Sequence, residues 1–90
     1  MTGTQETSAT VRSQLKSYIE EAFLYLHPGL ELKDGDSFLE LGVIDSLGFV
    51  ELVEEVQQRY GISVSDVDIT EENFGSIDAL VAFVEAKRAA

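Results

Sequence analysis

Cysteine and tryptophan are absent from this 90-residue chain, and histidine, proline and methionine each occur once. Without cysteine, the fold cannot depend on disulfides or on thiolate metal sites, which suits a reducing cytoplasm. Nowhere is an apolar run long enough to span a membrane, and residues 1–10 lack the basic and apolar regions of a secretory signal. We therefore expect one soluble, cytoplasmic domain.

Basic residues are also scarce, with six against seventeen acidic ones and a formal net charge of −11. Between Glu31 and Ala86 the only basic residues are Lys33 and Arg59. So acidic a chain is unsuited to nucleic acid and to anionic membrane surfaces, and its charge favours a basic protein partner. We expect a monomer that binds neither nucleic acid nor membrane.

The apolar residues recur at three- and four-residue spacing, as in amphipathic helices, and strand-like alternation of useful length is missing. Residues 1–8 are expected to be frayed or disordered, with a helix cap at Thr7 or Ser8. A first helix is predicted from near Ala9 to Leu26. Pro28 ends it, because proline disfavours helical geometry in the preceding residue, and His27 is interpreted as a helix-end residue.

The second helix is predicted from Ser46 to Tyr60, with Gly61 as its left-handed cap. Its buried stripe is expected to comprise Phe49, Leu52, Val53, Val56 and Tyr60. A single turn capped by Thr70 should end at Phe74, and a last helix capped by Ser76 should run to Arg88. The fold class is therefore all-α: a small four-helix bundle with three main helices, a short third helix and a long loop between helices one and two, in a domain over residues 9–88.

The long connection from Leu30 to Asp45 is rich in apolar residues, so we expect it to pack across the core. Its Asp34-Gly35-Asp36 segment is not a calcium loop, because Phe38 stands where an oxygen ligand is needed. No metal site is predicted. A second loop is expected to place some of its apolar residues, Val64, Val67 and Ile69, in the core.

One flank of the second helix carries Leu47 and Val50 beside three carboxylates, Glu51, Glu54 and Glu55. The two apolar residues fall outside the main stripe. They can either widen the core face or form an exposed apolar strip edged by acidic groups, and periodicity alone leaves both alternatives open.

Ser46 follows Asp45 at the expected helix start, yet the chain supplies no base to activate its hydroxyl. The single histidine, His27, lies at the end of another helix, and a carboxylate that caps a helix is a poor base. We therefore predict that the protein is not an enzyme. A serine there suits an anionic group, because free amides and the helix dipole stabilise a phosphate. Gly48, which lacks a side chain, is expected to leave room for another surface to approach.

The run Leu41-Gly42-Val43-Ile44-Asp45-Ser46-Leu47 resembles the phosphopantetheine attachment motif of the acyl and peptidyl carrier proteins. The likeness extends from about Val11 to Lys87. It implies that Ser46 receives a 4′-phosphopantetheine arm from coenzyme A through a phosphopantetheinyl transferase, and that the arm carries acyl groups as thioesters. It also implies that Asp45 helps to engage the transferase. The implied docking surface comprises Asp45, Leu47, Val50, Glu51, Glu54 and Glu55.

Further partners implied by the resemblance are an adenylation enzyme or acyltransferase that loads the arm, and downstream synthase, condensation or tailoring enzymes. Fatty acid carriers usually have an acidic residue where this chain has Gly48. The motif looks more like that of free-standing D-alanyl, polyketide or nonribosomal peptide carriers, so specialised biosynthesis is expected. The alternatives are a fatty acid synthesis carrier, an unmodified acidic adaptor that binds its partner without an arm, and a serine-dependent hydrolase.

Overall fold

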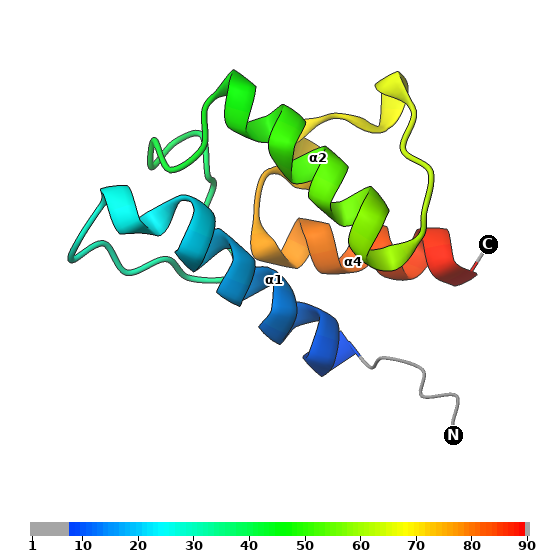
Figure 1. The fold of residues 1–90 in the computed structure, drawn as a ribbon, viewed down its shortest axis with the longest axis horizontal. Helices are drawn as coiled ribbons and strands as arrows, with labels where there is room; N and C mark the ends of the chain where they lie inside the picture. The colour runs from blue at the N-terminus through cyan, green and yellow to red at the C-terminus, as the bar shows by residue number, and fades with distance from the viewer. Residues whose placement is uncertain (1–7, 90) are drawn as a thin grey trace.

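Four α-helices form the fold of the computed structural model, which describes residues 8–89 (Figure 1). The helices are α1 (Ser8–Ala22), α2 (Ser46–Tyr60), α3 (Glu71–Phe74) and α4 (Ile77–Ala89). Two 3-10 turns, η1 (Leu24–Leu26) and η2 (Asp66–Asp68), lie in the connections, and no strand occurs within residues 8–89. The predicted all-α bundle with a short third helix and a long first loop is confirmed.

The N-terminal predictions are tested only from Ser8 onward. Ser8 is the first residue of α1, whereas the frayed segment before it and the candidate cap Thr7 lie outside the described residues. None of the helices within residues 8–89 is long and apolar enough to cross a membrane.

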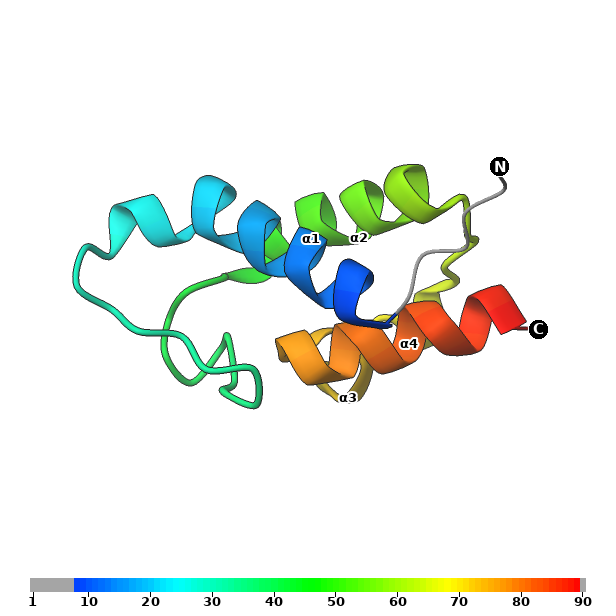
Figure 2. The same ribbon diagram turned by 90° about the horizontal axis from the view of Figure 1, so that it is seen from below.

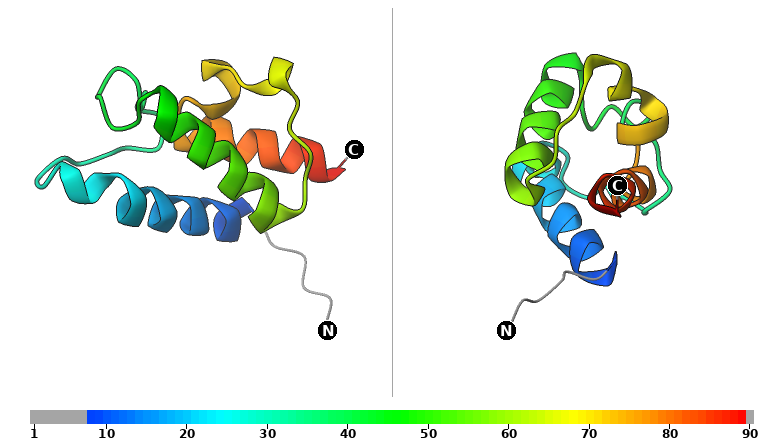
Figure 3. Two further views of the ribbon diagram at one scale, coloured as in Figure 1. Left: turned by 45° about the horizontal axis from the view of Figure 1, so that its top comes forward. Right: turned by 90° about the vertical axis from the view of Figure 1, so that its right-hand side faces the viewer.

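The core gathers apolar side chains from α1, α2, α3, α4 and the long loop between α1 and α2. α4 packs on both α1 and α3. Figures 2 and 3 show the long helices α1, α2 and α4 arranged around one core, with α3 beside α4. The Tyr60 hydroxyl donates a hydrogen bond to Gln14 Oε1 at 2.8 Å, which joins the end of α2 to α1.

Helix α2 follows its prediction closely. It begins at Ser46 and ends at Tyr60, and Gly61 has the left-handed conformation (φ 62°, ψ 36°) expected of its cap. The Gly61 N–H donates to the Gln57 carbonyl at 2.9 Å. The predicted buried stripe is confirmed: four of its members are buried and Phe49 is packed against the core. This helix therefore presents a fixed outer face to solvent.

The first helix is shorter than predicted. α1 ends at Ala22, and the chain continues through the tighter turn η1 rather than to Leu26 as α-helix. Leu26, the last residue of the predicted helix, is 65% exposed, and its neighbour Tyr25 is 67% exposed. The change of helix type at Phe23 rotates the following side chains out of the α1 register, because a 3-10 helix has three residues per turn. His27 ends η1, which confirms it as a helix-end residue.

The long loop between α1 and α2 is pinned to the bundle, as predicted. Phe38 is fully buried, and its N–H donates to the Gly75 carbonyl at 2.8 Å. Earlier in the loop, Asp34 accepts a hydrogen bond from Arg12 at 2.8 Å and pairs with Lys16 at 3.2 Å. Arg12 also reaches Asp78 at the start of α4. These contacts hold the loop, and with it the start of α2, against both α1 and α4.

The second loop was predicted less well. Val64 packs partly against the core, but Val67 is 83% exposed and Ile69 is exposed as well. Ser65 and Asp68 form a reciprocal capping box around η2, and Lys87 pairs with Asp68 at 3.0 Å. Because this short turn is held by polar contacts, its apolar side chain at Val67 points outward.

Candidate functional site

Ser46 is the first residue of α2, and its side chain is exposed. Asp45 precedes it in extended conformation (φ −98°, ψ −174°), and Asp45 Oδ1 accepts a hydrogen bond from the Gly48 N–H at 2.8 Å. The first amides of a helix have no partner within the helix, and Asp45 satisfies one of them. The remaining amides and the helix dipole suit a phosphate attached to the serine oxygen.

Gly48 has a different role from the one predicted. It is buried, and a Cβ atom there would lie 2.8 Å from Cγ2 of Ile44 and 3.0 Å from Cε1 of Phe23. The space that its missing side chain leaves is therefore filled by the protein's own α1 and loop. The room predicted directly beside Gly48 is thus taken up by Ile44 and Phe23, because the side of α2 that carries Gly48 faces α1.

Leu47 and Val50 are 71% and 55% exposed, so they do not widen the core face. Glu51 and Glu54 are exposed on the same helix. The structure thus decides between the two alternatives in favour of an exposed apolar strip edged by carboxylates. These residues and Asp45 all belong to α2 or its cap, so they move with Ser46 as one rigid element.

Glu55 differs from the other carboxylates. It is half-buried and accepts a hydrogen bond from Arg59 Nε at 2.9 Å. Arg59 also lies over the ring of Tyr18, with 5.9 Å between its Cζ and the ring centroid. Burial raises the pKa of Tyr18, and the nearby Glu55 and Glu51 charges raise it further. Glu55 is therefore turned toward α1, where Arg59 already balances its charge.

Within residues 8–89, no side chain that could act as a base is hydrogen-bonded to the Ser46 hydroxyl. His27 lies nearer to the start of α2 than its place in the sequence suggests, because it lines an open hollow together with Asp45 and Leu47. Ser46 does not line that hollow. Consecutive helical side chains point about 100° apart, so Ser46 and Leu47 face different flanks of α2. Nothing in this arrangement activates the hydroxyl as a nucleophile.

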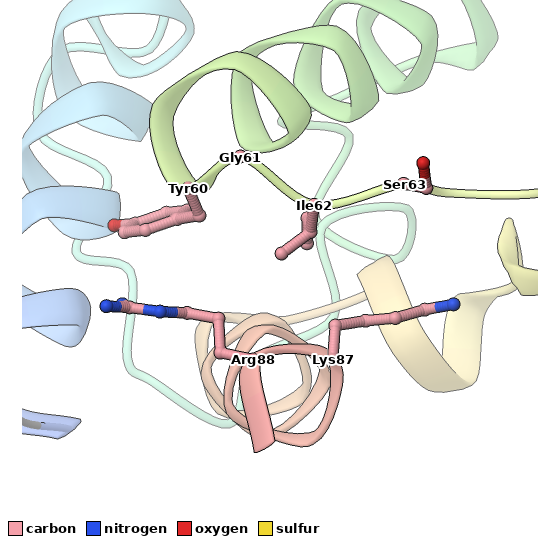
Figure 4. A pocket seen from close by; sticks show the side chains of 6 residues that line it. All are labelled: Tyr60, Gly61, Ile62, Ser63, Lys87 and Arg88. Atoms are coloured by element: carbon pink, nitrogen blue, oxygen red, sulfur yellow. The ribbon is translucent and has the colours of Figure 1, made fainter. Parts of the chain in front are cut away.

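A second hollow lies at the other end of α2, lined by Tyr60, Gly61, Ile62, Ser63, Lys87 and Arg88. Figure 4 shows Lys87 and Arg88 leaving α4 in opposite directions. Arg88 lies over the Tyr60 ring, 5.7 Å from its centroid, and Lys87 is paired with Asp68. Both cations are engaged within the protein. The helix ends beside this hollow are also C-terminal ones, which disfavour an anion.

The sequence did not indicate Tyr25 and Leu26 as residues near the site. They border the hollow that contains Asp45 and Leu47, and both are exposed. Pro28 indicated that the helix ends before it, but it restricts only the preceding residue and gave no signal for the earlier end at Ala22.

Comparison with known proteins shows the family to which the chain belongs. Residues 13–84 match the family described as "Phosphopantetheine attachment site", and Asp45 and Ser46 lie within the match. The chain is 31% identical over 74 residues to a "D-alanyl carrier protein" of Streptococcus suis (strain 05ZYH33), covering 82% of this chain and 90% of that protein. A protein of the same name from strain 98HAH33 is 30% identical over the same shares. The chain therefore belongs to the phosphopantetheine-dependent carrier proteins, and its prosthetic group is 4′-phosphopantetheine.

Proposed function

We propose that Ser46 is the attachment point of the 4′-phosphopantetheine arm, and that the protein carries an acyl or aminoacyl group on it between partner enzymes. The observation that carries this proposal is an exposed serine at the first position of α2, beside unpaired helix amides. When bound, the arm supplies a thiol that forms a thioester with the cargo.

The residues around Ser46 fit an attached phosphate and a visiting enzyme. Asp45 fixes the helix start through its bond to the Gly48 N–H, so the backbone that carries Ser46 is held in place. In the transfer, Ser46 Oγ forms a bond to phosphorus, the nucleotide part of coenzyme A leaves, and the serine proton passes to the transferase. The carrier itself contributes position, not acid or base.

The proposed docking surface of α2 comprises Asp45, Leu47, Val50, Glu51 and Glu54, with Glu55 in a secondary role because Arg59 already pairs with it. Exposed carboxylates around apolar side chains suit a groove lined by Arg and Lys, and their charge speeds the encounter. The proposed partners are a phosphopantetheinyl transferase, a loading enzyme, and the synthase, condensation or tailoring enzymes that use the cargo.

Two independent observations support an inference about the cargo. Both relatives named above are D-alanyl carrier proteins, which supports an aminoacyl group activated by an adenylation enzyme. Gly48 after Asp-Ser-Leu supports a polyketide, nonribosomal peptide or related specialised pathway over fatty acid synthesis. A panel of adenylation enzymes offered to the modified protein identifies the cargo by the acid that becomes attached.

Intact mass spectrometry tests the attachment. After incubation with coenzyme A and a broad-specificity transferase, the wild-type protein should gain the mass of one phosphopantetheine, and Ser46→Ala should gain none. Ser63→Ala is the matched control, because Ser63 is also exposed but lies beyond the far end of α2 (Figure 4). A gain that survives Ser46→Ala contradicts the proposal. Full partner binding by unmodified Ser46→Ala would instead favour an adaptor that needs no arm.

A further inference from the structure

An open hollow of about 370 Å³ separates the end of α1 from the start of α2. We call it the α1–α2 hollow. On one side lie Tyr25, Leu26 and His27 of η1 and its cap, and on the other lie Asp45, Leu47 and Glu51. Its floor includes Phe23, Val43 and Gly48, all of which are buried. Two segments far apart in the sequence thus face one another beside the proposed attachment point.

The walls of this hollow carry large apolar side chains that the fold leaves uncovered. Tyr25, Leu26 and Leu47 are each about two-thirds exposed or more (67%, 65% and 71%). Exposing apolar surface costs free energy, and when such residues gather around one depression they mark an interaction site more often than isolated ones do. The hollow therefore has the apolar content of a docking site.

The two walls are held at a fixed separation. Gly48 allows α2 to approach Phe23 so closely that no Cβ would fit without displacement. Asp45 caps α2, and Val43 is anchored by its N–H bond to the Phe38 carbonyl at 2.9 Å. The hollow is thus formed before any partner arrives, which lowers the entropy lost on binding.

Charge decides what can occupy the hollow. Asp45 and Glu51 stand among its walls, and the whole chain carries a net charge of −11. A second copy of this chain, or an anionic membrane, would bring like charges together. The complementary occupant is an apolar side chain of another protein flanked by Arg or Lys.

Among the proposed partners, the transferase must bring its active site to the serine oxygen itself. A standard interface covers about 800 Å² on each partner, a patch with a radius of roughly 16 Å. Asp45 and Leu47, which line the hollow, are the chain neighbours of Ser46. An interface of that size centred on Ser46 is wide enough to reach the hollow through these two neighbours.

We propose that the α1–α2 hollow is a docking site for the phosphopantetheinyl transferase, which inserts an apolar side chain between η1 and Leu47. This inference rests on the proposed function of Ser46. It adds Tyr25 and Leu26, from a different helix, to the recognition surface of α2.

The test compares the kinetics of modification of wild-type protein and a Tyr25→Ser/Leu26→Ser double variant, followed by intact mass. Loss of apolar contacts at the centre of an interface is expected to lower kcat/KM at least about tenfold, mainly through a higher KM. Leu47→Ser, on the opposite wall, should act in the same direction. Val67→Ser is the matched control because Val67 is 83% exposed in η2, at the right of Figure 1, whereas η1 lies at the left.

A kcat/KM of the double variant within about twofold of wild type would overturn the hollow as a docking site. An equal loss in Val67→Ser would overturn it too, because the effect would then belong to exposed apolar surface in general. Tyr25 and Leu26 are exposed, so thermal melting should be nearly unchanged in the double variant. Failure of the proposed function looks different: wild-type protein gains no mass, or Ser46→Ala gains it.

Discussion

Gly48 and Phe23 touch so closely that a Cβ atom on Gly48 would lie 3.0 Å from Cε1 of Phe23. This contact joins the last buried residue before η1 to the first turn of α2. It explains why glycine, a poor helix former, occupies a helical position beside the proposed attachment point. The low helix propensity of glycine is offset here by the close packing of α2 against Phe23.

We predict that Gly48→Ala destabilises the protein. Alanine gains up to about 1 kcal/mol of helix propensity. Its methyl group, however, meets the buried side chains of Ile44 and Phe23, and overpacking of this kind costs about 1 to 3 kcal/mol. Urea unfolding should therefore show a net loss of stability. Gly35→Ala is the control, because its Cβ would meet only Asp78 Oδ2 at 3.6 Å; a more stable Gly48→Ala would refute the contact.

A pair of substitutions at Asp45 separates its two roles. Asp45→Ala removes the bond to the Gly48 N–H and should cost about 1 kcal/mol of stability, as is typical of a lost helix cap. Asp45→Asn keeps an oxygen acceptor, and asparagine caps helices as well as aspartate does. The asparagine variant should melt like wild type yet be modified more slowly by the transferase, because the negative charge is gone. If both variants are modified at the wild-type rate, Asp45 is a cap and nothing more.

The sequence was sufficient for the features that depend on neighbours along the chain. The bounds of α2, the left-handed Gly61 and the buried stripe from Leu52 to Tyr60 follow from local periodicity and capping. The start of α2 at Ser46 and its cap at Asp45 were predicted for the same reason, whereas the attachment role of Ser46 was predicted from the resemblance of its motif.

What was missed depends on segments that meet only in the folded chain. Gly48 is visible in the sequence, but nothing there shows that Phe23 fills the space beside it. Arg12 in α1 pairs with Asp34 in the long loop and with Asp78 in α4. Contacts between three separate segments leave no periodic pattern in the sequence. The exposure of Leu26 follows from a switch to 3-10 geometry, which apolar spacing alone does not reveal.

The two faces of α2 should respond to substitution in opposite ways. Val53 is buried, so Val53→Ala should lower the free energy of unfolding by about 1 to 3 kcal/mol while leaving the docking surface intact. Glu54 is exposed, so Glu54→Ala should scarcely change stability but should weaken binding of a basic partner. Denaturant melts and partner titrations measure the two effects. The reverse pattern would show that the buried and docking faces have been exchanged.

The ion pairs at Asp34 should make stability depend on pH in a defined direction. Hydrogen bonds from Lys16 and Arg12 hold the pKa of Asp34 below its ordinary value. A lowered pKa in the folded state means that the pairs stabilise the protein above the unfolded pKa of about 3.9, and that this contribution is lost as the pH falls through the lower folded value. Asp34→Asn should therefore melt below wild type at neutral pH, and the difference should shrink in acid.

The matched control for Asp34→Asn is Glu31→Gln, which removes one exposed carboxylate from the same loop. Both substitutions remove one negative charge and change the net charge from −11 to about −10, so the difference between their melting temperatures reports on the ion pairs of Asp34. That difference should be largest at neutral pH, where Asp34 is ionised, and should diminish as the pH is lowered below about 4. Equal melting temperatures at neutral pH would mean that the loop is held by Phe38 and its backbone bond to Gly75 instead.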